Sequence, residues 1–193
     1  MIIGITGLMG SGKSLVGSFI FKTFGVCVYD CDSIAHRLYE CADVVNEVEK
    51  IVGTHRNPDN SFSRSSLLKY LLKNPSEIRH VNNIMHPLII KKITEYAIVN
   101  KAKNQHYIVL APLLFECKME NLFDKTIYIY TDHNLRIQRL KNSRELDEKI
   151  IKFFDIQQFP AKNKFSMCDH VVLNNGHQSE LESEIYKLFM KIL

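Results

Sequence analysis

Residues 7–14 read Gly-Leu-Met-Gly-Ser-Gly-Lys-Ser, which fits the phosphate-binding pattern of a glycine, four residues and then Gly-Lys-Ser. Residues 2–6 before this stretch are apolar like a short buried strand, and residues 15–24 after it have the apolar spacing of a helix. A glycine-rich turn that opens a helix presents backbone N–H groups and the positive end of the helix dipole to an anion. The stretch therefore predicts a nucleotide phosphate site within an α/β fold.

Two side chains of the stretch add chemistry that the backbone lacks. Lys13 can reach the outer phosphates of ATP, and the Ser14 hydroxyl can bind Mg²⁺. A chance match to the pattern is the alternative, but the flanking strand and helix argue against it. We expect the nucleotide to contact the following consecutive residues: Gly10, Ser11, Gly12, Lys13, Ser14 and Leu15.

Composition limits the class of protein. The chain has 193 residues, 46% of them hydrophobic, and a net charge of +4, which favours anionic ligands but is too small to indicate nucleic acid. The longest nearly continuous apolar run, residues 107–115, is too short to cross a bilayer. The residues before the phosphate-binding stretch lack the basic region and the cleavage site of a signal peptide, so we expect none. The odd set of five cysteines contains no Cys-x-x-Cys pair. We expect a cytoplasmic enzyme without a cysteine metal site.

The order of elements predicts a parallel sheet with a helical insert. Further strands are expected at residues 25–29, 107–111, 126–130 and 170–174. Residues 33–104 carry helical patterns and no strong strand signal, which is more than the single crossover that such a sheet needs. Within this insert we expect one helix from Pro75 and another that begins at His86-Pro87. The helical residues beyond those that one crossover needs are suited to the binding of a second substrate.

Two carboxylates follow the second strand, in Asp30-Cys31-Asp32. Ligands of open α/β sheets bind beyond the carboxyl ends of the strands, so Asp32 is a candidate site residue. It can also cap the next helix, and the two roles are compatible.

A basic helical stretch lies between the fourth and fifth strands. Residues 136–164 contain eight lysines and arginines against four acids. A solvated helix face accounts for most of these lysines. The planar guanidinium groups of Arg139 and Arg144 suit phosphate contact, which predicts a basic lid that closes over ATP.

These features occur in an order that resembles the dephospho-coenzyme A kinase family over nearly the whole chain. The matching motifs are Asp30-Cys31-Asp32-Ser33-Ile34-Ala35-His36, residues 82–89 around His86-Pro87, Pro112-Leu113-Leu114-Phe115-Glu116, Arg139-Leu140, Gln158-Phe159-Pro160 and residues 168–174. The sequence departs from the family pattern at three positions: Leu15 replaces a threonine, His36 an arginine, and Ser143 the second lid arginine, with Arg144 adjacent.

The resemblance implies transfer of the γ-phosphate of ATP to the ribose 3′-hydroxyl of dephospho-CoA, with Mg²⁺, as the last step of coenzyme A biosynthesis. It implies a three-layer α/β P-loop kinase fold, with a five-stranded parallel sheet covered by helices on both faces. The expected core covers about residues 1–32, 105–135 and 166–193, the helical acceptor subdomain about 33–104, and the lid about 136–165.

The resemblance, together with the chemistry of the side chains, also assigns roles to residues. The expected catalytic residues are Lys13, Asp32 and Arg139, with Arg144 as a further nucleotide contact and Ser14 as the metal ligand. The expected acceptor contacts are Asp32, Arg64, His86 and Glu116, although His86 can be purely structural. We expect a monomer that binds neither nucleic acid nor membrane.

Two other functions fit part of the sequence. Another P-loop kinase, acting on a nucleotide or a small metabolite, would share the loop, the acceptor carboxylate and the lid. A nucleotide-dependent switch is less favoured, since Asn100-Lys101-Ala102-Lys103 lacks the aspartate of the guanine-specific Asn-Lys-x-Asp motif.

Overall fold

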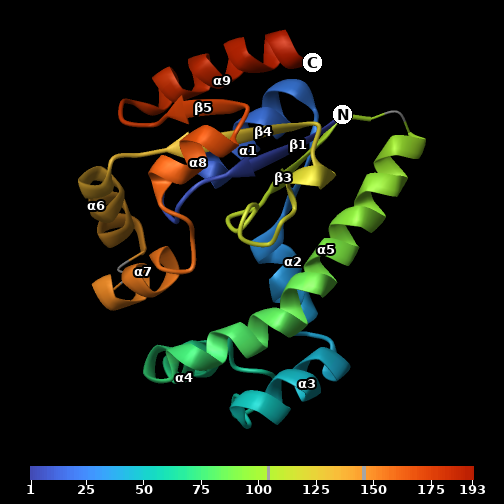
Figure 1. The fold of residues 1–193 in the computed structure, drawn as a ribbon, viewed down its shortest axis with the longest axis vertical. Coiled ribbons are helices and arrows are strands. Elements are labelled where there is room, and N and C mark those ends of the chain that lie inside the picture. Colours follow the sequence, from blue (N-terminus) through green and yellow to red (C-terminus); the bar gives the residue numbers. More distant parts are fainter. Residues whose placement is uncertain (104, 145–146) are drawn as a thin grey trace. The chain divides into compact units, whose positions relative to one another are not determined.

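The computed structural model describes residues 1–103, 105–144 and 147–193, with the side chains of residues 143 and 144 outside the description (Figure 1). The chain divides into two compact units. The first combines Met1–Asp30 with Tyr96–Leu193, and the second is Cys31–Glu95. Each unit has buried apolar side chains of its own.

A parallel sheet forms the centre of the first unit. Its strands are β1 (Ile2–Thr6), β2 (Cys27–Asp30), β3 (Tyr107–Leu110), β4 (Lys125–Tyr130) and β5 (His170–Leu173). The strand order is β2-β3-β1-β4-β5, and all four pairings are parallel. The phosphate-binding stretch follows β1 and therefore leaves the sheet at its central strand. The predicted five-stranded parallel sheet is confirmed.

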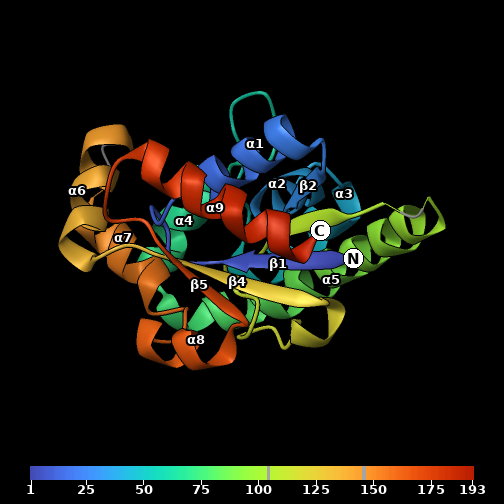
Figure 2. The same ribbon diagram turned by 90° about the horizontal axis from the view of Figure 1, so that it is seen from above.

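Helices cover both faces of this sheet. Those of the first unit are α1 (Lys13–Phe24), α6 (His133–Arg144), α7 (Glu148–Asp155), α8 (Ala161–Met167) and α9 (Gln178–Ile192). Figure 2 shows α1 and α9 on one face and α8 on the other. On the first face Ile3, Ile5, Ile20 and Phe189 share one buried cluster. The predicted three layers are confirmed.

The opposite face of the sheet is covered at close range. A Cβ atom on Gly4 would lie 2.6 Å from Leu114 and 2.9 Å from the ring of Phe123, so this position of β1 accepts no side chain. Further along the same face, the ring of Phe165 in α8 lies 5.0 Å from that of Tyr130 and 5.5 Å from that of Tyr128. These aromatic contacts hold α8 against β4.

The second unit is helical. It contains α2 (Cys31–Leu38), α3 (Ala42–Val52), α4 (Arg64–Lys73), a 3₁₀ turn (Pro75–Glu77) and the first part of α5 (Ile78–Ala102). In α3 the valines at 44, 45, 48 and 52 recur at helical spacing and are all buried. Ser63 caps α4, because its hydroxyl accepts a hydrogen bond from the backbone N–H of Ser66 at 3.3 Å.

The expectation of a helix start at His86-Pro87 is wrong. Residues 78–102 form the single helix α5, with Pro87 in its interior. A proline inside a helix removes one backbone donor, and its ring crowds the carbonyl four residues earlier. The buried side chains of Val81, Met85 and Ile93 nevertheless recur at intervals of four and eight residues along α5. Packing of this face stabilises the helix across the proline. Across the described residues, no helix combines the length and the apolar character that a membrane crossing requires.

Candidate active site

The phosphate-binding stretch has a backbone shape that requires glycine. Gly10 has φ of +80° and Gly12 has φ of +100°, both in the left-handed region that strains other residues. A Cβ atom would also lie 2.7 Å from Leu140 Cγ at Gly10 and 2.3 Å from Asn174 Nδ2 at Gly12. The loop is therefore fixed both by its own conformation and by the residues packed around it.

Carbonyl groups of the loop are anchored from outside. The carbonyl of Ser11 accepts hydrogen bonds from Asn174 Nδ2 at 2.8 Å and from Thr131 Oγ1 at 3.1 Å. The carbonyl of Met9 accepts one from Arg136 Nη1 at 3.0 Å. In a planar trans peptide the next N–H points opposite to the carbonyl, so these anchors also fix the directions of the Gly10 and Gly12 N–H groups. The loop is a preorganised anion cradle.

The side chains of the predicted nucleotide contacts are distributed around this loop. Lys13 Nζ donates to the carbonyls of Gly7 at 2.7 Å and Leu8 at 3.1 Å, so its charge lies over the start of the loop. Leu15 packs against the hydrophobic core of the first unit. Ser14 lines a pocket of about 430 Å³ together with other residues of α1 and residues of β2 and β3.

This pocket identifies Asp30 as a residue that sequence reasoning passed over. Asp30 is the last residue of β2 and lines the pocket with Ser14, in the first unit. Asp32, the predicted catalytic residue, is an exposed residue in the first turn of α2 and belongs to the second unit. The signal was present in the sequence, because ligands of open α/β sheets bind beyond the carboxyl ends of the strands, and both aspartates occur at such an end.

The donors beside the loop are hard oxygen ligands. In the part of the chain that the structure describes, no cluster of three or more histidine, cysteine, aspartate or glutamate side chains suits a metal ion. Mg²⁺ needs no such cage, because it keeps several waters and binds through one or two carboxylates and the substrate phosphates. A hydroxyl and a carboxylate, as in Ser14 and Asp30, fit this chemistry.

The lid arginines differ in their surroundings. Arg139 donates to the carbonyl of Asn174 at 2.8 Å and to that of Gly176 at 3.3 Å, in the loop that follows β5. Leu140, the next residue, packs where a Cβ of Gly10 would lie. The side chain of Arg144 lies outside the described residues.

Glu116 forms a buried ion pair. Its Oε1 lies 3.0 Å from Lys164 Nζ and accepts the backbone N–H of Phe159 at 2.5 Å. Its Oε2 is buried without a hydrogen-bond partner among the described residues. Burial lowers the pKa of Lys164, and the carboxylate of Glu116 opposes that shift. Half of the Glu116 carboxylate is thus engaged within the first unit, and its predicted contact with the acceptor stays a prediction.

A second pocket, of about 360 Å³, lies within the helical unit. Arg64, the first residue of α4, lines it together with His36, Glu40, Tyr39 and Phe62. The Tyr39 and Phe62 rings stack at 4.9 Å. Burial raises the pKa of Tyr39 to about 12 despite the opposing charge of Arg64, so its hydroxyl remains a hydrogen-bond donor at neutral pH. The pocket therefore combines a cation, a donor and an aromatic wall.

One wall of this pocket is held by a paired arginine. Arg56 donates to both carboxylate oxygens of Glu49, at 2.8 and 2.7 Å, whereas the Arg64 guanidinium makes no hydrogen bond or ion pair within residues that the structure describes. His86, the remaining predicted acceptor contact, lies in α5 and is half-buried, and burial lowers its pKa. This shift favours the neutral form of the His86 imidazole.

The predicted site residues thus fall into two groups. The first unit contains residues 10–15, Glu116 and Arg139, and the helical unit contains Asp32, Arg64 and His86.

Known proteins resemble the chain over its full length. The family model for dephospho-CoA kinase matches residues 1–180. A dephospho-CoA kinase of Fusobacterium nucleatum subsp. nucleatum is 30% identical over 191 residues, which cover 96% of this chain and 95% of that protein. One of Gamma-proteobacterium EBAC31A08 is 28% identical over 198 residues, which cover 100% and 98%.

A solved structure agrees with the fold. The dephospho-CoA kinase from Campylobacter jejuni superimposes with a TM-score of 0.72 at 24% identity, covering 99% of this chain and 96% of that one. The motif order, the anchored phosphate loop and the match to the family model all indicate the same family. The chain belongs to the dephospho-CoA kinase family, whose reaction transfers the γ-phosphate of ATP to the ribose 3′-hydroxyl of dephospho-CoA and completes coenzyme A biosynthesis.

Proposed function

We propose that the first unit binds the phosphates of ATP at residues 10–14 and that the helical unit holds dephospho-CoA. The observation that carries this proposal is the anchored loop after β1, whose N–H groups are fixed before any ligand arrives. Phosphoryl transfer depends on positioning and charge neutralisation more than on covalent chemistry, so such a cradle is suited to it.

On the donor side, Lys13 exchanges its two carbonyl partners for oxygens of the outer phosphates. The short distance between Lys13 Nζ and the loop supports this exchange. Ser14 and Asp30 would hold Mg²⁺, directly or through water, because both line one pocket beside the loop. When bound, the ion supplies positive charge to the phosphate oxygens.

On the acceptor side, Asp32 accepts a hydrogen bond from the ribose hydroxyl and takes its proton. Its place two residues after the carboxyl end of β2 in the chain supports this role. The pocket beside Arg64 holds part of dephospho-CoA: the guanidinium attracts phosphate, and the aromatic wall accepts less polar groups. His86 contacts dephospho-CoA, and burial, which lowers its pKa, favours its neutral form. Glu116 also contacts dephospho-CoA, and its Oε2, which has no hydrogen-bond partner among the described residues, is available for this contact.

The segment of residues 136–165 acts as a lid. Arg139 leaves the carbonyls of the loop after β5 and stabilises charge on the transferring phosphoryl group, and Arg144 assists it. The protein works as a monomer in the cytoplasm, without a membrane as a partner. It binds no nucleic acid, which the modest net charge of +4 supports.

Release of ADP in the presence of different acceptors tests the activity. ATP and Mg²⁺ are supplied with dephospho-CoA, nucleoside monophosphates, shikimate or buffer alone. Dephospho-CoA should stimulate ADP release well above the others, with the new phosphate on the ribose 3′ oxygen by phosphorus NMR. ADP release with dephospho-CoA equal to that in buffer would sink the proposal, and slow hydrolysis unaffected by any acceptor would favour a switch.

Variants separate the roles of the residues. Lys13→Ala should lower kcat by about 10²–10³, since it removes positive charge from the transition state. Asp32→Asn should lower kcat by about 10²–10⁴ with the KM for ATP nearly unchanged. Asp43→Asn is the matched control, an exposed aspartate in the first turn of α3. If Asp32→Asn instead abolished ATP binding while turnover held, Asp32 would be a nucleotide or metal ligand.

A further inference from the structure

Arg136 is a buried arginine that connects the lid to the phosphate-binding loop. It lies in α6 with a side chain that is 1% exposed. Its Nη1 donates to the carbonyl of Met9 at 3.0 Å and to Asp155 Oδ1 at 3.0 Å, and its Nη2 donates to Asp155 Oδ2. Asp155 is the last residue of α7. One guanidinium thus joins both lid helices to the loop.

A buried ion pair is an inefficient way to stabilise a lid, because its two charges lose their hydration. Removing two charges from water costs more than many ion pairs return, and apolar residues of similar size often replace such pairs without loss of stability. The Nε atom of Arg136 is also buried with no hydrogen-bond partner in the described part of the chain. The pair therefore calls for an explanation other than stability, and its contact with Met9 offers one.

The contact with Met9 controls a phosphate-binding group. The Met9 carbonyl and the Gly10 N–H belong to one planar peptide and point in opposite directions. Holding the carbonyl outward therefore aims the Gly10 N–H toward the inside of the loop. At the Ser11–Gly12 peptide the corresponding anchors, Thr131 and Asn174, lie outside the lid helices. The Met9–Gly10 peptide differs because its anchor belongs to the lid.

We propose that Arg136 and Asp155 are positioning residues that set the Met9–Gly10 peptide for ATP and make its orientation depend on the packing of α6 and α7. This rests on the proposed binding of ATP phosphates at residues 10–14. Arg136 touches the back of the loop and not the substrate. Its effect is therefore on ATP affinity and turnover, with little effect on the affinity for dephospho-CoA.

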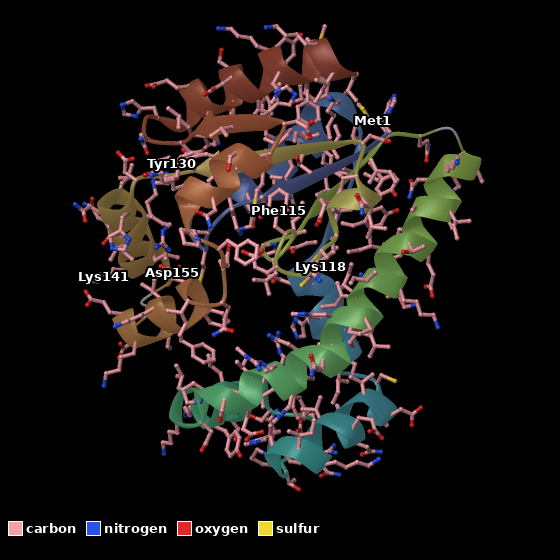
Figure 3. The ribbon with its side chains drawn as sticks, viewed as in Figure 1. Met1, Phe115, Lys118, Tyr130, Lys141 and Asp155 are labelled. Atoms are coloured by element: carbon pink, nitrogen blue, oxygen red, sulfur yellow. The ribbon has the colours of Figure 1, made fainter. Side chains whose placement is uncertain are left out.

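A matched control exists on the same two helices. Lys141 of α6 pairs with Glu148 of α7, and their side chains are 49% and 70% exposed. Figure 3 shows Asp155 on the side of these helices that is nearer to the sheet and Lys141 on the outer side. The outer pair joins α6 to α7 as the inner pair does, but it lacks a contact with the loop.

The experiment compares kinetics and melting temperatures of three variants. Arg136→Met should raise the KM for ATP by about tenfold or more and lower kcat, with the KM for dephospho-CoA within about twofold of wild type. Arg136→Met with Asp155→Leu removes both charges and should fold at least as stably as the single variant, yet keep the raised KM for ATP. Lys141→Met with Glu148→Gln should leave the KM for ATP unchanged.

Two results would overturn the proposal. Wild-type KM for ATP in the Arg136→Met/Asp155→Leu variant would show that the pair acts through lid stability alone. An equal rise in KM for ATP in the outer-pair variant would show that any link between α6 and α7 suffices. Lys13→Ala, measured in parallel, separates this proposal from the proposed binding of ATP at the loop. Normal turnover of Lys13→Ala would refute ATP binding at the loop. Loss of turnover in Lys13→Ala, together with a wild-type KM for ATP in Arg136→Met/Asp155→Leu, would refute only the role of Arg136.

Discussion

Replacing Lys164 with methionine should strongly destabilise the first unit. The Lys164 side chain is fully buried in α8. Its Nζ donates to the carbonyl of Pro112 at 3.0 Å and to Gln158 Oε1 at 2.8 Å, and lies 3.0 Å from Glu116 Oε1. Methionine fills a similar volume but offers no donor, so the carboxylate of Glu116 is left as a buried charge without its cation.

The size of the effect follows from that uncompensated charge. Removing one partner of a buried ion pair costs about 3–5 kcal/mol. Glu116 is 11% exposed, so solvent compensates little of this. A native protein has about 5–15 kcal/mol of stability in total, so the loss is a large fraction of it. For a chain of this length each kcal/mol lowers Tm by about 2–4 °C, which predicts a fall of roughly 6–20 °C.

Urea unfolding and thermal melting measure this loss. The double variant Lys164→Met/Glu116→Gln removes both charges and should recover most of the stability, because the glutamine oxygen still accepts the N–H of Phe159. Lys162→Met, two residues away on the exposed side of α8, should change stability by less than about 0.5 kcal/mol. A double variant as unstable as the single one would refute the assignment of the cost to the buried charge.

Two further variants test the loop and the pH dependence. Gly12→Ala should lower Tm and raise the KM for ATP, because left-handed strain of about 1–2 kcal/mol adds to the clash of a methyl group 2.3 Å from Asn174 Nδ2. Gly25→Ala is the control: Gly25 also has a positive φ, but a Cβ there would have no atom within 4 Å, so this variant should share the strain and leave the KM for ATP unchanged. Equal effects of the two variants on the KM for ATP would rule out the clash. Burial raises the pKa of Asp169, but hydrogen bonds from Thr126 at 2.7 and 2.8 Å and a neighbouring lysine outweigh it and hold that pKa below its usual value. The stability that ionised Asp169 contributes is present above about pH 4 and is lost as the pH falls through its lowered pKa. The difference in unfolding free energy between wild type and Asp169→Asn should therefore shrink in acid. A difference that stays constant with pH would contradict this prediction.

Local patterns predicted those parts of the fold that depend on neighbouring residues. Residues 107–110 and 127–130, within strands β3 and β4, are runs of aliphatic and aromatic side chains, and a buried strand of a parallel sheet needs little else. The phosphate-binding loop was readable because its glycines and lysine are adjacent in the chain. The continuous helix through Pro87 was missed, since the packing that stabilises it comes from outside the local sequence.

Charge runs illustrate the limit of this reasoning for the site. The basic stretch of residues 136–164 favours a solvated helix face, yet Arg136 and Lys164 are buried. The partners that make their burial possible include Met9, 127 residues from Arg136, and Pro112, 52 residues from Lys164. No periodicity records which of several similar cations will meet such a partner.

The sequence by itself determined the chemistry of this protein: a glycine-rich phosphate loop, carboxylates after the second strand, and an ordered set of motifs that fits a dephospho-CoA kinase. Each of these features lies within a short stretch of adjacent residues, so it can be recognised without the tertiary structure. Tertiary structure alone decided which side chains hold the loop in shape, and within the first unit it placed Asp30 and Ser14 in the lining of one pocket. The reason is physical, because a hydrogen bond or a buried charge is defined by its partner, and the partners here are brought together only by the folded sheet.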